Sequence, residues 1–267
     1  MAVVLITGCS SGFGLATAQA FAERGDTVVA TARDPSRIPE SFARVRLDVT
    51  DQGSINAAVA ETIQRHGRID VLVNNAGIGT LGALELVDDQ QLRRVFDTNV
   101  FGAMAVTRSV LPHMRQQGSG RVIFVNAIGG VLTTAFLGAY CASKHALDCI
   151  AAVFDLELRP FGIRVSSVYP SAFRTSMGQN NTVILGEGTA YAESTRTYRE
   201  GLLQRSRNGP SDLSPVTDAI VDAATNPDPP LRYLIAPHLA DVLGPAMSAL
   251  DQLHDREISM TPGIPKT

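Results

Sequence analysis

A tyrosine and a lysine four residues apart are the first candidates for chemistry in this 267-residue sequence. Tyr140 and Lys144 lie in the stretch "GAYCASKHAL", and on a helix this spacing places two side chains on one face, about 5–6 Å apart at Cβ. An ordinary phenol titrates near pH 10, so proton transfer near neutrality requires that a nearby ammonium group stabilise the phenolate. The pair therefore predicts an acid/base centre. By itself the spacing also suits a solvated pair on a helix surface.

A glycine-rich turn, "LITGCSSGFGLA", predicts a phosphate site near the N-terminus. Gly8, Gly12 and Gly14 come directly after an apolar run and open a helical pattern. Glycines here let the backbone turn tightly and approach a pyrophosphate, whose charge the helix N-terminus stabilises. A strand before the turn and a helix after it favour a dinucleotide site over an unliganded turn.

The end of the second apolar run bears on the choice between the two nicotinamide cofactors. A carboxylate about 20 residues past the glycines suits the ribose 2′-hydroxyl of NAD, whereas an arginine suits a 2′-phosphate. This run ends "ATARDP", with Ala32 where a carboxylate would stand and Arg33 directly after it. Asp34 argues against the arginine, since it is placed to pair with Arg33. The pattern predicts NADP(H).

Seven short apolar runs alternate with helical patterns along the chain. The runs lie at 2–7, 27–32, 45–49, 70–75, 121–127, 163–170 and 231–236, and clear helical patterns cover 14–25 and 54–67. Strands that are apolar on both faces are typical of a buried parallel sheet. We expect one α/β domain over 1–267: a Rossmann-type, doubly wound parallel sheet of about seven strands with helices on both faces.

Two stretches are expected to line a substrate pocket. Residues 174–212 are polar and lose the strand rhythm, as expected for an insertion that folds over a cleft, and residues 128–137 are mostly apolar. The final stretch, "MTPGIPKT", is expected to be a loose tail.

Composition excludes several classes of function. With 23 Lys+Arg against 26 Asp+Glu and no basic run, nucleic acid is not an expected partner. Three cysteines and five histidines form neither a disulfide framework nor a cluster with metal-ligand spacing, so no metal site is predicted. No apolar stretch is long enough to span a membrane, and "MAVVLITG" begins without a basic leader, which favours a cytoplasmic protein.

The motifs together resemble the short-chain dehydrogenase/reductase family over about residues 3–176. They follow the family's order: "TGCSSGFG" 7–14, "LDVTD" 47–51, "NNAG" 74–77, "TNVFG" 98–102, "YCASK" 140–144 and "YPSAFRT" 169–175. The first motif and "ATARDP" are most similar to the branch containing 17β-hydroxysteroid and retinol dehydrogenases. The resemblance implies an oxidoreductase, either a ketoreductase or an alcohol dehydrogenase. It also implies hydride transfer with a small-molecule substrate, which the apolar stretch suggests is hydrophobic, and a homodimer or homotetramer.

The resemblance also implies a role for each matching position. Tyr140 matches the acid/base, Lys144 the residue that binds the nicotinamide ribose and lowers the pKa of the tyrosine, and Asn99 the backbone position of a water relay. Asn99 follows Leu92 and Val95 on an apolar helix stripe, where a buried amide must be hydrogen-bonded. The implied cofactor positions are Gly8, Ser10, Ser11, Gly12, Phe13, Gly14, Arg33, Asp48, Val49, Asn75, Ala76, Gly77, Tyr140, Lys144, Pro170, Phe173 and Thr175.

Ala127 departs from the family pattern at the catalytic centre. The family has a serine thirteen residues before the tyrosine, and alanine cannot donate its hydrogen bond. Losing such a donor typically costs about 10²–10³ in turnover. Three interpretations are open: an engineered Ser-to-Ala variant of low activity, an enzyme that borrows a donor from Asn126, Thr133 or Thr134, or an impaired NADP(H)-binding protein with a sensing or regulatory role.

Two further remarks qualify this centre. Asn126 is expected to point to the opposite side of its strand from Ala127, which argues against it as the substitute. Ser171 stands where the family usually has glycine and fits without strain only if its φ is negative.

Overall fold

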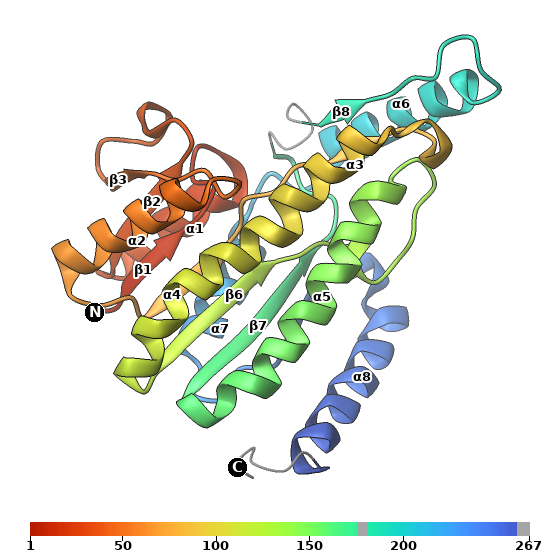
Figure 1. The fold of residues 1–267 in the computed structure, drawn as a ribbon. Coiled ribbons are helices and arrows are strands. Elements are labelled where there is room, and N and C mark those ends of the chain that lie inside the picture. The colour runs from red at the N-terminus through yellow and green to blue at the C-terminus, as the bar shows by residue number, and fades with distance from the viewer. Residues whose placement is uncertain (176–180, 261–267) are drawn as a thin grey trace.

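Seven parallel strands form the central sheet of the computed structural model, which describes residues 1–175 and 181–260. The strands are β1 Val3–Ile6, β2 Thr27–Ala32, β3 Ala43–Arg46, β4 Val71–Asn74, β6 Gly120–Val125, β7 Ile163–Pro170 and β9 Arg232–Ile235. Their order is β3-β2-β1-β4-β6-β7-β9, so the chain winds outward in both directions from β1 and β4 (Figure 1). The predicted doubly wound parallel sheet is confirmed.

One predicted strand is shifted along the chain. The sequence predicted the third strand at 45–49, whereas β3 spans Ala43–Arg46. The strand ends before Asp48 because that carboxylate accepts a hydrogen bond from the Thr50 N–H (3.0 Å), which turns the chain toward the next helix. This turn brings Asp48 to the carboxyl end of the sheet.

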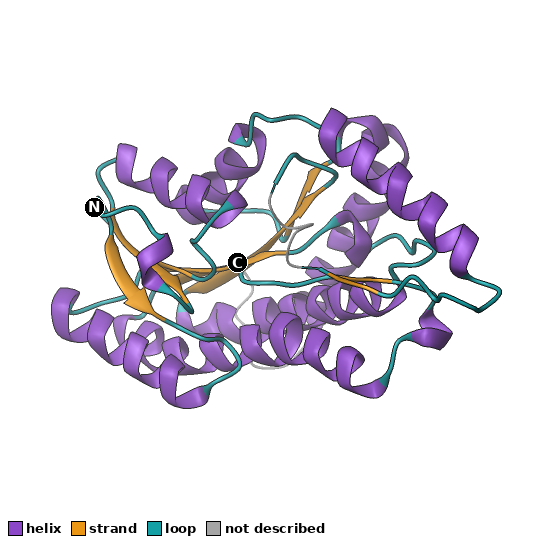
Figure 2. Cartoon of the chain, turned by 90° about the horizontal axis from the view of Figure 1, so that it is seen from above, coloured by secondary structure: helices purple, strands orange, loops and turns teal. Residues whose placement is uncertain are grey.

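Helices cover both faces of the sheet (Figure 2). On one face lie α1 Gly12–Glu23 and α7 Ser214–Thr225; on the other lie α2 Gln52–His66, α4 Ala103–Gln117 and α5 Gly138–Leu158. Helix α3 Asp89–Phe96 continues into α4 through a π-helical turn at Asp97–Gly102, and α8 Ala240–Met260 runs along α5. Short 3₁₀ turns occur at Pro35–Arg37, Leu84–Leu86, Ile128–Gly130, Arg159–Phe161 and Pro237–Leu239. Of the expected loose tail, residues 261–267 lie outside the described part.

The strands read as continuous apolar runs because both of their faces are buried. In β6, Val122 and Phe124 pack with the α2, α4 and α5 side, while Ile123 and Val125 pack with the α1 and α7 side. All four side chains are at most 6% exposed. Alternate strand residues therefore enter two separate cores, one on each face of the sheet.

The segment 174–212 contains two elements that the sequence did not predict. A short strand, β8 Thr182–Val183, pairs in parallel with β5 Thr80–Leu81, and α6 Ala192–Asn208 follows it. Helix α6 was hard to predict because it has no apolar stripe, and Thr195 is its only buried residue. Within the described residues no helix is long and apolar enough to cross a membrane.

Candidate active site

A cavity of about 1060 Å³ lies at the carboxyl ends of the strands. Open α/β sheets bind ligands at this edge because the loops that follow neighbouring strands meet there. Most of the predicted site residues line it: Gly8, Ser10, Ser11, Gly12, Phe13, Arg33, Asp48, Val49, Asn75, Ala76, Gly77, Ala127, Tyr140, Lys144, Pro170, Phe173 and Thr175. Of the predicted residues, Gly14 and Asn99 do not line the cavity. Each contacts residues that do: Gly14 lies against Gly8 and Asn75, and Asn99 is hydrogen-bonded to Ile78.

The glycine turn closes tightly on the strand next to it. Gly8 and Gly12 have φ values of 75° and 58°, in the left-handed region that favours glycine. A Cβ atom on Gly14 would lie 2.4 Å from the Gly8 carbonyl oxygen and 2.4 Å from Asn75 Nδ2, so no larger residue fits there without a shift of the backbone. Asn75 Nδ2 in turn donates to the Gly8 carbonyl at 3.1 Å. These contacts hold the turn open toward the cavity at the start of α1.

The arginine after β2 is not neutralised by its neighbour. Asp34 accepts hydrogen bonds from the N–H and hydroxyl of Ser36 (3.1 and 2.7 Å), which cap the 3₁₀ turn and hold the pKa of Asp34 below its usual value. Within the described residues, Arg33 forms no salt bridge. The concern that Asp34 would pair with Arg33 is therefore not realised, and Arg33 lines the cavity as a cation.

Asp48 forms the opposite side of this end of the cavity. Partial burial acts to raise the pKa of Asp48, but the hydrogen bonds from Thr50 and the charges of Arg33 and Arg46 together lower it below its usual value. The carboxylate is thus ionised, and its hydrogen bonds to Thr50 in the same turn hold it in place. This end of the cavity combines a fixed anion with two nearby arginines.

Tyr140 and Lys144 enter the cavity from the first two turns of α5. The Lys144 side chain is almost completely buried, and Nζ donates to the Val125 carbonyl at 2.9 Å. Burial lowers the pKa of Lys144 to about 8. Nζ lies 6.0 Å from the centroid of the Tyr140 ring, so the two predicted partners share one wall of the cavity.

The pKa of Tyr140 is raised, which differs from the sequence expectation. Desolvation by the surrounding side chains raises this pKa, and the adjacent Cys141 thiol adds to the effect, although Tyr140 also lines the cavity. Lys144 does not offset this burial in the ligand-free geometry because its ammonium group is bonded to Val125. The expected effect of Lys144 on the pKa of the tyrosine therefore stays a prediction.

Asn99 joins the loop after β4 to α5. Its Oδ1 accepts from the Ile78 N–H at 2.9 Å, while Nδ2 donates to the Ile78 carbonyl at 2.9 Å and to Ser143 Oγ at 3.0 Å. The Ser143 hydroxyl then donates to the Tyr140 carbonyl at 2.7 Å. Asn99 lies in the π-helical turn, a distortion often found at functional sites. The buried amide is thus satisfied and holds α5 in place; its expected part in a water relay stays a prediction.

Of the three substitutes named from the sequence, only Asn126 lines the cavity, and its amide nitrogen is buried. Ala127 lines the cavity in extended backbone (φ −164°, ψ 164°). Asn126 Oδ1 accepts from the Ala127 N–H at 3.0 Å, and its Nδ2 is fully buried without a partner in the described residues. Thr133 and Thr134 are not among the lining residues.

The apolar stretch 128–137 does not line the cavity, contrary to expectation. The 3₁₀ turn at Ile128–Gly130 packs against Tyr140. A Cβ atom on Gly129 would lie 3.4 Å from the tyrosine ring. Farther along, Phe136 packs against Tyr198 of α6 with ring centroids 5.5 Å apart. This stretch is therefore used for packing against α5 and α6.

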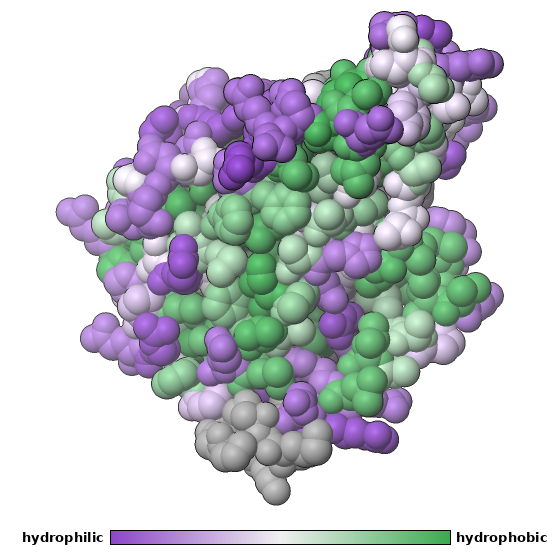
Figure 3. All heavy atoms as spheres, turned by 45° about the vertical axis from the view of Figure 1, so that its right-hand side comes forward, coloured by the Kyte–Doolittle hydropathy of each residue, from purple (hydrophilic) through white to green (hydrophobic). Residues whose placement is uncertain are grey.

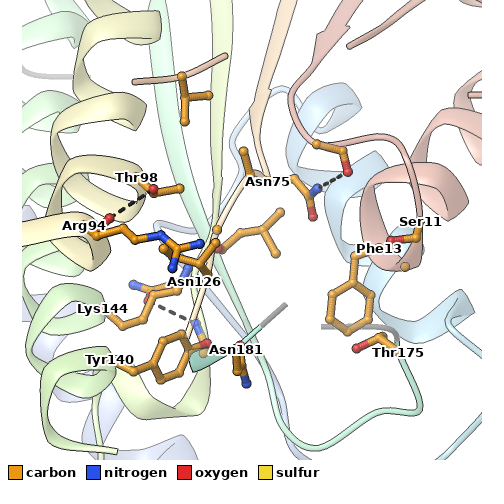
Figure 4. A pocket seen from close by; sticks show the side chains of 18 of the residues that line it. Ser11, Phe13, Asn75, Arg94, Thr98, Asn126, Tyr140, Lys144, Thr175 and Asn181 are labelled. Atoms are coloured by element: carbon orange, nitrogen blue, oxygen red, sulfur yellow. Dashed lines mark hydrogen bonds between the residues drawn. The ribbon is translucent and has the colours of Figure 1, made fainter. Parts of the chain in front are cut away.

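Further lining residues come from around α3 and from the segment 174–212, which was expected to fold over the cleft, although no single residue of that segment was predicted beyond Thr175. These are Asp89, Gln90, Arg93, Arg94, Asp97 and Thr98 around α3, and Asn181, Val183, Arg199, Leu202, Leu203 and Ser206 from the segment over the cleft. In Figure 4, Arg94 and Asn181 extend into the cavity from different elements. Apart from Thr98, which opens the motif "TNVFG", these residues belong to no motif, and only the tertiary structure identifies them.

The strand end after β7 is unstrained despite its serine. In the described residues Phe136 alone combines a side chain with a positive φ, so Ser171 avoids the left-handed region. The Ser171 N–H donates to the Ile235 carbonyl at 3.1 Å, and the next aromatic residue, Phe173, meets Phe13 edge-on at 5.6 Å between ring centroids. The serine thus continues the strand pairing, and its side chain requires no distortion.

Comparisons with known proteins agree with this geometry. The family described as short chain dehydrogenase matches residues 2–183. The chain is 38% identical over 242 residues to the 3-ketodihydrosphingosine reductase of Bacteroides thetaiotaomicron, with 88% of each chain covered. It is 33% identical over 255 residues to human 17-beta-hydroxysteroid dehydrogenase type 1, covering 86% of this chain and 76% of that protein.

Two solved structures share the fold over nearly the whole chain. A short-chain dehydrogenase from Streptomyces avermitilis has a TM-score of 0.82 and 38% identity, with 96% of each chain covered. A short-chain dehydrogenase/reductase from Burkholderia phymatum in complex with NAD has a TM-score of 0.78 and 25% identity, covering 100% of this chain and 98% of that one.

Proposed function

The chain belongs to the short-chain dehydrogenase/reductase family, and we propose that it is an NADP(H)-dependent oxidoreductase that interconverts an alcohol and a ketone or aldehyde. The observation that carries this proposal is the position of Tyr140 and Lys144 on the wall of the same cavity as the glycine turn. A proton donor and a dinucleotide site thereby share one enclosed space.

The residues present fit a dinucleotide cofactor. The left-handed Gly8 and Gly12, together with the clash that any Cβ on Gly14 would make, describe a turn that leaves room for a pyrophosphate at the start of α1. Arg33 is a cation without a salt bridge among the described residues, and it directly follows Ala32, the position at which NAD enzymes carry a carboxylate; this supports a 2′-phosphate and hence NADP(H). When bound, the cofactor supplies or accepts a hydride.

Tyr140 is the group that moves the proton in this proposal. In the reductive direction it gives its phenolic proton to the carbonyl oxygen, and in the oxidative direction the phenolate takes the proton of the alcohol. Since burial raises the pKa of Tyr140, the phenolate needs positive charge nearby. Lys144, whose Nζ lies 6.0 Å from the centroid of the Tyr140 ring, would provide that charge.

The far part of the cavity supports a hydrophobic substrate. Between β5 and α6 it is lined by apolar side chains: Ile78, Leu81, Val183, Leu202 and Leu203. Such a surface binds an alkyl chain or a ring system by removing apolar area from water. The two relatives reported above are named for a ketodihydrosphingosine and a hydroxysteroid, which agrees with this assignment.

Ala127 supports a second candidate function. Without the serine hydroxyl the substrate oxygen lacks a donor that typically contributes about 10²–10³ in rate. A chain that binds NADP(H) in the same cavity but converts substrate only very slowly would act as a sensing or regulatory protein. The two functions share the cofactor site and differ in turnover.

Self-association through α4 and α5 is part of the proposal. Phe101, just before α4, and Val153 on α5 are 56% and 44% exposed, high values for such large hydrophobic side chains. Figure 3 shows hydrophobic residues spread over one face of the molecule. We expect a homodimer or homotetramer, measurable by light scattering of the purified protein.

The test is NADPH oxidation, followed by the absorbance of the reduced nicotinamide, with a panel of hydrophobic ketones and aldehydes. Turnover that Tyr140→Phe removes, with NADPH binding retained, supports the oxidoreductase. NADPH binding without turnover of any substrate in either direction, by both the native chain and Ala127→Ser, contradicts it and favours the regulatory alternative.

A further inference from the structure

The side chain of Asn181 is fixed on one side and open to the cavity on the other. Its Oδ1 accepts from the Gly79 N–H at 2.9 Å, and the next residue, Thr182, donates its N–H to the Gly79 carbonyl at 3.1 Å. The amide also lies directly over Gly79, where Oδ1 is 2.6 Å from the position a Cβ would take. The loop after β4 thus holds Asn181 by one face.

The amide nitrogen of Asn181 is available to a ligand. Because Oδ1 is held by Gly79, the two N–H groups of Nδ2 point away from that bond, and within the described residues they have no acceptor. Asn181 lines the cavity, and Figure 4 shows its side chain among those of the lining residues. An oriented amide donor, without an acceptor among the described residues, therefore faces the substrate space.

The same loop connects Asn181 to the acid/base pair. A Cβ on Gly77 would lie 3.8 Å from Lys144 Nζ and 3.3 Å from Asn99 Oδ1, and Gly79 is only two residues further along. In Figure 4 the phenol end of Tyr140 points across the cavity toward Asn181, whereas Arg94 and Thr98 lie together on another part of the wall. Asn181 and Tyr140 thus line the same part of the cavity from different elements.

Asn126, the residue directly before Ala127, does not offer its amide nitrogen to a ligand in the same way. Asn126 Nδ2 is fully buried, so a substrate oxygen does not reach it without a rearrangement of the chain. Asn126 Oδ1 is bonded to the Ala127 N–H and lies 2.6 Å from the Cβ position of Gly130, which restricts that rearrangement. Both asparagines line the cavity, and the full burial of the Asn126 amide nitrogen is what distinguishes them.

From this contrast we propose that Asn181 donates the hydrogen bond to the substrate oxygen that a serine at position 127 would otherwise give. The inference rests on the proposed oxidoreductase function. In the reductive direction the carbonyl carbon receives the hydride of the reduced cofactor and the oxygen takes the Tyr140 proton, so the C=O double bond becomes a C–H and an O–H bond. Asn181 keeps both amide protons and stabilises the negative charge that develops on the oxygen.

Two substitutions separate this role from that of an anchor for the loop. Asn181→Asp keeps an oxygen for the Gly79 N–H but removes the donor, whereas Asn181→Ala removes both. Loss of the donor predicts a decrease in kcat of about 10²–10³ for both variants, with the dissociation constant for NADPH unchanged. Full activity of Asn181→Asp beside an inactive Asn181→Ala identifies an anchor and overturns the proposal.

The decisive measurement is a double-mutant cycle with Ala127→Ser. If the serine hydroxyl and Asn181 serve the same oxygen, the loss caused by Asn181→Ala shrinks to about tenfold or less in the Ala127→Ser background. Equal losses in both backgrounds mean that the two positions act independently and overturn the proposal. Thr182→Val is the matched control, since it removes contacts to Gln91 and Arg94 beside Asn181 and leaves the amide intact.

Failure of this inference is distinguishable from failure of the proposed function. A native chain without turnover beside an active Ala127→Ser supports the oxidoreductase and refutes Asn181 as a donor. If the native chain is active and neither Asn181 substitution changes its activity, the oxidoreductase function is likewise supported and Asn181 is likewise refuted as a donor. Absence of turnover in every variant refutes the oxidoreductase function itself, and with it the inference.

Discussion

Replacing Lys144 by methionine is expected to change the pH dependence of stability in a defined direction. Burial lowers the pKa of Lys144 from 10.5 to about 8, and the side chain is 3% exposed. Between these two values the unfolded chain binds a proton that the folded protein has released. The free energy of unfolding of the native chain therefore rises with pH across this window, because the cost of the buried charge disappears.

The magnitude follows from the two pKa values. Far below pH 8 the buried ammonium group costs about 3 kcal/mol, at about 1.4 kcal/mol for each pH unit between 8 and 10.5. Between pH 6.5 and 9.5 the linkage relation returns about 2 kcal/mol of this to the native chain. The methionine side chain of the variant carries no charge and gains nothing over the same interval. The hydrogen bond to the Val125 carbonyl, which the variant loses, shifts its stability by an amount that does not depend on this titration.

The assay is urea unfolding of both proteins without cofactor at about pH 6.5 and 9.5. The difference in unfolding free energy between Lys144→Met and the native chain should move by about 2 kcal/mol in favour of the native chain at the higher pH. Tyr140 is common to both proteins, and its raised pKa keeps it protonated over this range. A difference that is the same at both pH values refutes the argument that Lys144 is buried as a charged group.

Three further substitutions test other parts of the structure. Arg33→Asp should weaken NADPH binding roughly 10–150-fold, the value of a hydrogen bond to a charged group, and leave NADH binding nearly unchanged in fluorescence titrations; an unaltered preference contradicts the assignment of NADP(H). Gly14→Ala should destabilise the fold by about 3 kcal/mol or more, because its Cβ would lie 2.4 Å from the Gly8 carbonyl; Gly244→Ala, with open space around the Cβ, is the control in urea unfolding and should be neutral or slightly stabilising. Asp51→Ala removes the side chain that caps α2 through Gly53 and Ser54, and calorimetry should detect a loss of about 1 kcal/mol.

Strand positions were predictable because their signal is local. A buried parallel strand must be apolar on both faces, so runs such as 27–32 and 163–170 match β2 and β7 residue for residue. The glycine turn is equally local, since its left-handed positions and its place between β1 and α1 follow from neighbouring residues. Helix α2 ends at Gly67 in the left-handed conformation, where its pattern also ended.

The individual lining residues from α3 and from the segment over the cleft were not predictable because their positions depend on contacts between distant parts of the chain. Asn181 is held by Gly79, 102 residues earlier, and no periodicity in the sequence records that pairing. The same limit explains the error over 128–137, whose apolar character is used for packing, with Phe136 against Tyr198. Apolar composition indicates burial without stating what covers the residues.

By itself the sequence determined the parallel sheet, the glycine turn, the Tyr140/Lys144 spacing and the alanine at position 127. The tertiary structure decided how these groups are charged and which donors lie near them: it buried Lys144, raised the pKa of Tyr140, buried the amide nitrogen of Asn126 and placed Asn181 on the cavity wall. Spacing along one helix is a local property of the backbone. Desolvation and the direction of an amide depend on every element packed around the site, and those are assembled only when the chain folds.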